Sequence, residues 1–418
     1  MKSFIIKGDI GYSSAGRALN LHANSYLVVE YGECRGVFDA IPAAFRGLEI
    51  LDYTGKLVMP GLVDLHLHAP QYPVRALGMD MELLEWLNKH AFPQEAMYEN
   101  LEYADQAYAI FAESMKKSFT TRACVFGTVH AEATALLAQK LEDSGLVTFV
   151  GKVNMDRNCP DALQETDAIG ETKRFLALCE GFENTKPILT PRFIPSCSDK
   201  LCSALGELAV SEALPVQSHV SENLGEIEWV RALHPHSPSY GHVYDKFSLF
   251  GQTPTVMAHC VHSSDEEIAL IKQRGVFIAH CPQSNVNLAS GIAPARRYLD
   301  MGLNMGLGTD VAGGSSEDML RAAVDAVMVS KLRWRLVDES LRPLSFEDAF
   351  YLATLGGGTF FGRVGSFEDG FEADAIVLSD DAFSSPMELS LRERLERIFY
   401  LGSKNCISAK FVRGERIF

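Results

Sequence analysis

Residues 60–68 read Pro-Gly-Leu-Val-Asp-Leu-His-Leu-His, a short apolar run that ends on two histidines separated by one residue. Side chains two positions apart on a β-strand share a face, so His66 and His68 can point in the same direction where such a strand ends. Two imidazoles placed in this way can chelate one metal ion. The run therefore predicts a strand with a metal site at its C-terminal end.

The same pattern, an apolar run closed by a polar residue and followed by a stretch with helical spacing, repeats as far as residue 310. The strand-like runs are residues 57–66, 120–125, 146–153, 188–193, 214–219, 255–259, 276–281 and 304–310. Helical spacing is found between them in residues 101–117, 133–143, 199–212, 265–274 and 317–332. Eight β-then-α units predict an α/β fold, a closed (β/α)8 TIM-like barrel. An open doubly wound sheet would need a Gly-rich phosphate turn after its first strand, and the sequence has none.

Both ends of the chain lie outside this repeat, because a barrel uses about 250 residues. Residues 1–56 and 365–418 combine Gly and Asp turns with short apolar or alternating runs, for example residues 25–29 and 375–378. We predict that the two ends pair into one small β-sandwich domain formed by both chain termini. The barrel domain would then consist of residues 57–364.

Composition restricts the classes of partner. The chain has 418 residues and a formal net charge of −16, which argues against binding to nucleic acid or to an anionic membrane. No segment approaches the roughly 18 apolar residues of a membrane-spanning helix, and the apolar run near the N-terminus is too short for a signal peptide. The nine cysteines include no C-x-x-C pair, which argues against a disulfide framework. We therefore expect a cytoplasmic protein.

Three further predicted strands end on residues that could complete a metal site. The fifth strand ends at His219, the sixth at His259 and the eighth at Asp310. Barrel enzymes place their active sites at this end of the strands. An ion held by imidazoles and a carboxylate, with one position open to water, is typical of catalytic zinc. Glu222 follows the fifth strand closely and could move protons between water and substrate, although a solvated carboxylate in the first turn of a helix is the alternative.

Other histidines and one lysine are weaker candidates. Residues 234–236 read His-Pro-His but are expected in a solvated loop, and residues 130–132 read His-Ala-Glu without the Pro-Cys-x-x-Cys of the cytidine-deaminase type of zinc site. His280 ends the seventh strand, where it could line the site or serve only for packing. Lys152 ends the third strand and could bridge a second metal as a carbamate. Because the fourth strand ends in Arg192, we expect a single metal.

The run at 60–68, the two strand-end histidines and Thr309-Asp310 resemble the metal-dependent amidohydrolase superfamily, whose members have a (β/α)8 barrel and a β-sandwich built from both termini. Within it the chain resembles the guanine deaminases. The stretches that carry this resemblance are residues 68–72 (His-Ala-Pro-Gln-Tyr), 83–87 with 92–93, 190–197, 217–223 and 309–314, and residues 365–375 also look familial. At residues 315–318 the chain reads Ser-Ser-Glu-Asp where the family often has an aromatic residue, which concerns one pocket wall and not the metal site.

The resemblance implies a role for each matching residue. The expected ligands of one Zn2+ per subunit, with iron as an alternative, are His66, His68, His219 and Asp310, with His259 on the metal or its water. Glu222, Asp310 and His259 would act in catalysis. The expected substrate site comprises His68, Ala69, Pro70, Gln71, Arg192, Phe193, His219, Glu222 and Asp310. The resemblance also implies a homodimer acting on free guanine.

Physical chemistry supports this pocket separately. Guanine presents O6 and N7 as adjacent acceptors, which the guanidinium of Arg192 can meet with two N–H groups. Gln71 offers a donor and an acceptor to the ring edge, and Phe193 can pack on the purine plane. Trp86 and Phe92 are expected in the lid and core. In the expected reaction, activated water attacks C2 of guanine, Glu222 protonates N3, and ammonia leaves to give xanthine.

Two alternatives come from different classes. The nearest is a deaminase or chlorohydrolase on the same scaffold that acts on cytosine, an adenosine derivative or a triazine. The other is a non-catalytic assembly protein of amidohydrolase type. Such a protein could lose its metal ligands, whereas every expected ligand is present here.

Overall fold

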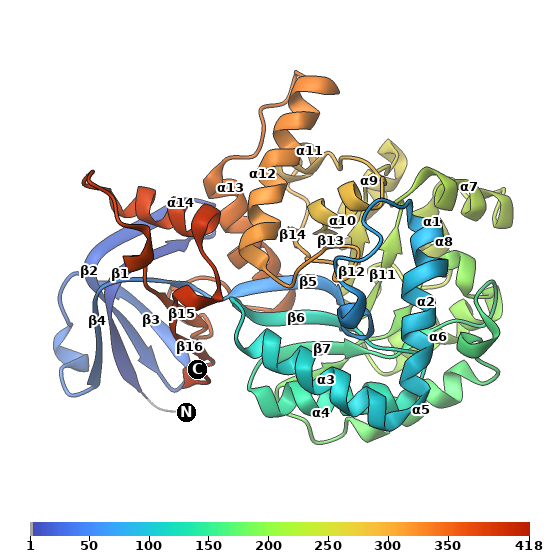
Figure 1. The fold of residues 1–418 in the computed structure, drawn as a ribbon, viewed down its shortest axis with the longest axis horizontal. Coiled ribbons are helices and arrows are strands. Elements are labelled where there is room, and N and C mark those ends of the chain that lie inside the picture. Colours follow the sequence, from blue (N-terminus) through green and yellow to red (C-terminus); the bar gives the residue numbers. More distant parts are fainter. Residues whose placement is uncertain (1–2) are drawn as a thin grey trace.

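Eight parallel strands form the larger sheet of the computed structural model, which describes residues 3–418 (Figure 1). Their order is β11-β12-β13-β14-β5-β6-β7-β9. They are β5 (Leu62–His68), β6 (Thr120–Phe126), β7 (Val147–Gly151), β9 (Thr185–Pro187), β11 (Val216–Val220), β12 (Thr255–His259), β13 (Phe277–His280) and β14 (Met305–Leu307). A parallel bridge between Leu189 and Val216 joins the two ends of this order. The sheet is thus closed, and the predicted (β/α)8 barrel is confirmed.

The first predicted strand divides in two. Residues up to Pro60 belong to β4 (Glu49–Pro60) of the second sheet, whereas β5 carries both histidines. Gly61 joins the two strands at a point where a Cβ atom would lie 2.2 Å from the Thr121 side chain. Only glycine fits this close approach, so the chain can pass from one sheet into the other here.

The fourth predicted strand is also interrupted. Residues 188–193 contain only the short strand β10 (Thr190–Pro191), which pairs with β8 (Val153–Asn154), and β9 lies just before them. Pro187 and Pro191 have no N–H to donate, so a continuous ladder cannot form through this segment. The chain is instead extended and irregular up to Arg192.

Most of the helices cover the outside of the barrel (Figure 1). In chain order the helices of the barrel domain are α1 (Leu83–Trp86), α2 (Phe92–Ala96), α3 (Leu101–Lys116), α4 (Ala131–Ser144), α5 (Ala168–Leu178), α6 (Asp199–Ser211), α7 (Leu224–Leu233), α8 (Tyr240–Lys246), α9 (Asp265–Arg274), α10 (Pro282–Asn287), α11 (Ala295–Asp300), α12 (Met319–Leu336) and α13 (Phe346–Tyr351). Their ends follow local rules: the Asn100 side chain caps the start of α3, and Gly145 and Gly275, both left-handed, end α4 and α9. The five predicted helices are all present, and α12 continues four residues beyond its predicted end.

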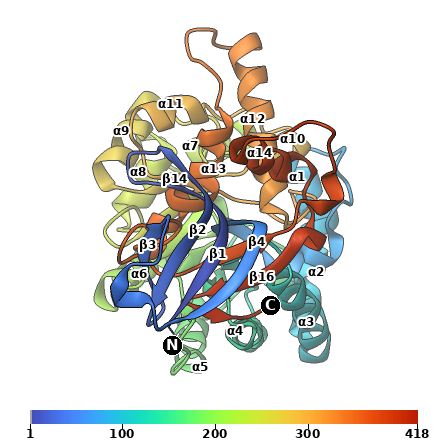
Figure 2. The same ribbon diagram turned by 90° about the vertical axis from the view of Figure 1, so that its left-hand side faces the viewer.

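The second sheet combines strands from both ends of the chain, in the order β17-β16-β15-β4-β1-β2-β3 (Figure 2). Besides β4 these are β1 (Phe4–Ser13), β2 (Leu19–Glu30), β3 (Glu33–Phe38), β15 (Ala375–Leu378), β16 (Ile407–Val412) and β17 (Glu415–Arg416), with helix α14 (Leu391–Leu401) between β15 and β16. Strand β15 pairs antiparallel with β4 and so brings the two termini together. The fold is therefore a TIM barrel with a small domain. The boundaries at residues 56 and 365 stay a prediction, and β4 runs across residue 56.

Two buried cations connect the small domain to the barrel. Arg122 of β6 donates to both carboxylate oxygens of Asp374, at 2.6 and 2.9 Å, and to Glu372. Lys410 of β16 donates to the backbone carbonyls of Met115, Lys116 and Ser118, at distances of 3.0–3.2 Å. These carbonyls lie at or just beyond the C-terminus of α3, where helix carbonyl groups lack partners of their own.

We expect Lys410→Met to lower the free energy of unfolding by about 3 kcal/mol, because three carbonyls, two of them buried, lose their donor at nearly constant side-chain volume. Urea unfolding followed by circular dichroism measures this change. Lys404→Met, at an exposed position near the start of β16, is the control and should change stability by less than about 0.5 kcal/mol. Equal stabilities of the Lys410 variant and the wild type would show that the three hydrogen bonds contribute nothing.

Two further features concern the helices and the cysteines. Within residues 3–418, no helix combines the length and the apolar character needed to cross a membrane. The nine cysteines all lie in this part of the chain and are free thiols, and eight of them are buried.

Candidate active site

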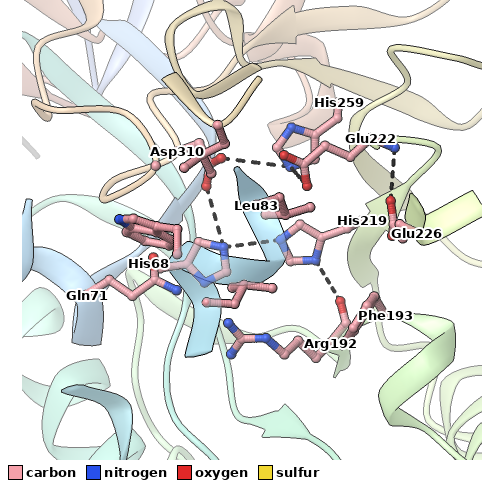
Figure 3. A pocket seen from close by; sticks show the side chains of 14 residues that line it. His68, Gln71, Leu83, Arg192, Phe193, His219, Glu222, Glu226, His259 and Asp310 are labelled. Atoms are coloured by element: carbon pink, nitrogen blue, oxygen red, sulfur yellow. Dashed lines mark hydrogen bonds and ion pairs between the residues drawn. The ribbon is translucent and has the colours of Figure 1, made fainter. Parts of the chain in front are cut away.

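The five predicted metal ligands meet at the C-terminal ends of the barrel strands, and Figure 3 shows four of them, His68, His219, His259 and Asp310. Nε2 of His66 lies 3.1 Å and Nε2 of His68 3.5 Å from Oδ1 of Asp310. Nε2 of His68 lies 3.2 Å from Nε2 of His219, and Nε2 of His259 lies 3.8 Å from Oδ2 of Asp310. The structure thus brings side chains from β5, β11, β12 and the end of β14 to one point.

Hydrogen bonds on the far side of two imidazole rings determine which nitrogen is free. Nδ1 of His219 lies 2.6 Å from the backbone carbonyl of Arg192, which can only accept, so the proton is on Nδ1. Nδ1 of His259 donates to Oδ1 of Asn285 in the same way, at 2.9 Å. In the neutral rings, both Nε2 atoms then carry the lone pair and can bind a cation. Nε2 of His66 is buried, and it also faces the cluster, 3.1 Å from Oδ1 of Asp310.

The charges of the cluster also suit a cation. Burial lowers the pKa of His66, His68 and His219, so these rings are neutral, as metal ligands must be. Burial alone would raise the pKa of Asp310, but the neighbouring His66 and His259 hold it well below its usual range. The neutral imidazoles of His66, His68 and His219 around the Asp310 carboxylate form a donor set that fits a divalent ion such as Zn2+.

Cys281 also lies within reach of His259 and Asp310. Its thiol donates to the carbonyl of Ala279, and burial raises the pKa of this thiol well above its usual value. Metal binding requires the thiolate, so we assign Cys281 to the barrel interior and not to the ligand set.

Glu222 is held in place beside this cluster. Its Oε1 accepts a hydrogen bond from the Ser290 hydroxyl at 2.9 Å, and its Oε2 lies 3.4 Å from Nε2 of His259. Its backbone N–H donates to the buried carboxylate of Glu226. Burial raises the pKa of Glu222 to about 7. A carboxyl group that titrates near neutral pH can both accept and release a proton during a reaction.

The backbone at the strand ends is held in a costly conformation. Ser221, His259 and Asp310 have φ values of 49°, 77° and 48°, in the left-handed region that favours glycine. Such conformations persist where the surrounding structure enforces them, and they are common at active sites. Here they direct the side chains of two strand ends into the same space.

A cavity opens directly beside the cluster (Figure 3). Of the predicted residues, it is lined by His68, Gln71, Arg192, Phe193, His219, Glu222, His259 and Asp310. The expected pocket residues Ala69 and Pro70 are not among the lining residues that the structure describes; they form the buried start of the 3-10 turn Ala69–Val74, which positions Gln71. In the view of Figure 3, Gln71 and Arg192 lie on one side of the cavity and Glu222 with His259 on the other.

The comparison with known proteins agrees with this geometry. The sequence profile of the amidohydrolase family matches residues 57–417, most of the chain. The chain belongs to the amidohydrolase family. This family is metal-dependent, which agrees with the ligand set at the strand ends.

The relatives of this amidohydrolase include several guanine deaminases. The enzyme of Dictyostelium discoideum is 39% identical over 379 residues, which cover 88% of this chain and 84% of that protein. The human enzyme is 41% identical over 391 residues, which cover 89% and 86%. The crystal structure of guanine deaminase from C. acetobutylicum with bound guanine superposes with a TM-score of 0.97 at 44% identity, and covers both chains completely.

Several residues that line the amidohydrolase site are not among the predicted site residues. Leu83, Trp86, Leu87, Leu288, Glu226 and Gly313 also line the cavity. Trp86, which the sequence placed in the lid or core, lines this cavity, and its Nε1 donates to the Leu77 carbonyl. The apolar members have the same signature as core residues, and no local motif distinguishes a buried leucine next to a cavity from one in the core.

The weaker candidates lie elsewhere in this amidohydrolase. Lys152 is buried in an ion pair with Glu165, and His234 lies 3.7 Å from Asp199 in a loop outside the cavity. His130 immediately precedes α4. His280 is buried, does not line the cavity, and has no hydrogen-bond partner for either ring nitrogen within residues 3–418. The metal-ligating groups found in that part of the chain all belong to the one cluster, in agreement with a single metal site.

Proposed function

We propose that this chain is a guanine deaminase, which hydrolyses guanine to xanthine and ammonia. It acts on the C–N bond of a cyclic amidine, as its curated relatives indicate. The observation that carries the proposal is one cavity that combines two hydrogen-bond donors, Arg192 and Gln71, with Glu222 and the metal-ligand cluster. Three functions are thereby combined: recognition of the base, activation of water and proton transfer.

The arrangement of these groups matches the two edges of guanine. O6 and N7 lie on one edge of the purine, whereas N3, C2 and the amine that leaves lie on the opposite edge. Arg192 and Gln71 can hold the first edge while the second faces Glu222. Phe193 supplies an apolar surface for the ring, and the side chains of Leu83 and Trp86, which also line the cavity, help to exclude solvent from it.

We assign one Zn2+ per subunit to His66, His68, His219 and Asp310, with His259 beside them, and keep iron as the alternative. When bound, such an ion lowers the pKa of water to about 7 and so supplies a nucleophile at neutral pH. The neutral imidazoles and the anionic Asp310 described above support this assignment.

The protein side chains perform the proton transfers. Glu222 accepts the proton of the attacking water and delivers it to N3 of guanine as the new C–O bond forms at C2. Asp310 accepts a hydrogen bond from the water and orients it, while His259 faces both carboxylates. A second proton then passes from the C2 hydroxyl through Glu222 to the amine. The C–N bond breaks, ammonia leaves, and xanthine remains with a carbonyl at C2.

Finer features of the proposal rest on the family. We propose a homodimer in the cytoplasm that serves purine catabolism or salvage. The substrate is a neutral free base, so the negative net charge of −16 does not oppose its binding. A phosphorylated substrate, in contrast, would bind better if basic side chains surrounded the entrance of the cavity.

A panel of heterocycles tests the proposed function. Ammonia release from guanine, cytosine, adenosine and an aminotriazine should be measured on one preparation whose metal content is known. We expect kcat/KM for guanine to exceed that for the others by at least about 100-fold, because a donor pair built for O6 and N7 is left unpaired by the wrong base. Preferential turnover of another base would establish the alternative deaminase, and a metal-free protein without hydrolytic activity would favour the assembly protein.

Replacing Arg192 with lysine tests the recognition of the base. Lysine retains the charge but loses the planar pair of N–H groups. We expect kcat/KM for guanine to fall about 50-fold, mainly through KM, because the lost contact holds the substrate and does not take part in the chemistry. Steady-state kinetics measure the change. An unchanged KM would exclude Arg192 from guanine binding.

A further inference from the structure

Glu95 of α2 contacts Arg192 and Gln71, the two side chains proposed to recognise the base. It is buried, with 1% of its surface exposed, and does not line the cavity. One carboxylate oxygen accepts from Nε2 of Gln71 at 2.8 Å, and the other accepts from Nη1 of Arg192 at 2.5 Å. A single carboxylate therefore holds both donors, one through each oxygen.

Further contacts restrict the same two side chains. The guanidinium carbon of Arg192 lies 4.9 Å from the centre of the Phe92 ring, also on α2, so that helix supplies both a ring face and a carboxylate. Oε1 of Gln71 accepts from the backbone N–H of Ala312 at 3.2 Å. Because a backbone N–H can only donate and a carboxylate can only accept, the orientation of the Gln71 amide is determined.

These contacts leave N–H groups for the substrate. Nε2 of Gln71 has one N–H left after its bond to Glu95, and Arg192 has four of its five N–H groups left after the Nη1 bond. Glu95 also supplies the negative charge that a guanidinium needs when it is this deeply buried. The cavity wall can then offer donors to an uncharged base.

We propose that Glu95 is a positioning residue that presents Arg192 and Gln71 as a donor pair to the O6 and N7 acceptors of a 6-oxopurine. Glu95 thereby sets the preference for a 6-oxopurine. An amino group at C6 would place its own N–H groups against the N–H groups of the protein, and a ring without a substituent at C6 would leave one protein donor without an acceptor. This inference deepens the proposed function and rests on it.

The variant Glu95→Gln tests the proposal. Glutamine has one acceptor oxygen, and its NH2 group would face either Gln71 or Arg192, so one of the two donors is released. We expect kcat/KM for guanine to fall about 30-fold through KM, with kcat within about threefold and metal content unchanged. Glu85→Gln, at an exposed position in α1, is the matched control and should behave as wild type.

Two readouts separate positioning from a general structural role. With 2-aminopurine, which has the reacting C2 amine but no O6, the variant should lose less than about threefold, so the preference for guanine falls about tenfold. In a double-mutant cycle with Arg192→Lys, the loss of the double variant should be smaller than the product of the two single losses, because part of the effect of Glu95→Gln passes through Arg192. Equal losses on both bases, or additive losses in the cycle, would overturn the proposal.

Glu95→Asp provides a second route if the glutamine variant does not fold. Aspartate keeps the charge but is one methylene shorter, so it cannot reach both donors. We expect the same fall in kcat/KM for guanine as in Glu95→Gln, again through a higher KM. A KM for guanine equal to that of wild type in Glu95→Asp would also overturn the proposal. A wild-type protein that releases no ammonia from guanine would refute the proposed function itself, which is a different result.

Discussion

Replacing Glu222 with glutamine is expected to lower kcat for guanine about 1,000-fold and to leave the bound metal in place. The amide has nearly the shape of the carboxyl group but cannot accept a proton from water or pass one to N3. Glu222 is not one of the assigned ligands, and its contacts with Ser290 and Glu226 are polar interactions that glutamine can largely keep. Ammonia release and metal analysis on the same preparation measure both parts of this prediction.

Glu228→Gln is the control for this experiment. Glu228 is an exposed carboxylate on α7, six residues from Glu222, and the same change of charge there should leave kcat unaltered. Near-normal turnover by Glu222→Gln would show that another group moves the protons. Loss of metal from that variant would instead place Glu222 in the ligand set.

The metal cluster could be predicted from sequence because its signal is local. Each ligand follows a recognisable apolar run, and parallel barrel strands bring their C-terminal ends to one rim. His66, His68, His219, His259 and Asp310 were therefore expected together, and the structure brings them together. Their roles as ligands stay a prediction until metal binding is measured.

The groups that orient these residues have no such signal. Glu95 lies 97 positions from Arg192, and Ser290 lies 68 positions from Glu222. Asn285 reaches His259 from the first turns of α10, and its sequence surroundings give no indication of that contact. Each role depends on how a helix or loop packs over the barrel mouth, which single-residue patterns do not specify. The interrupted fourth strand is different, because Pro187 and Pro191 could have indicated it.

Removal of the metal by a chelator is expected to abolish turnover of guanine, and added Zn2+ or Fe2+ should restore it. The reason lies in the protein: the cluster pairs one carboxylate with neutral, buried imidazoles, and none of these groups can itself make water nucleophilic at neutral pH. The thermal midpoint should also fall, because an ion that binds only the folded chain stabilises it. Metal analysis, ammonia release and thermal unfolding before and after chelation measure these effects, and metal analysis of the protein as purified identifies the ion it holds.

The variant His66→Gln should reproduce the chelated state without a chelator. Nε2 of His66 is buried and faces Oδ1 of Asp310 at 3.1 Å, so a cation bound there would contact both atoms. We expect the variant to lose most of its metal and at least about 1,000-fold in kcat. His236→Gln, which alters an exposed histidine of the second His-x-His sequence, should retain both. Full activity in a protein shown to contain no metal would contradict the assignment, because the water would then have to be activated by Glu222 and Asp310 alone.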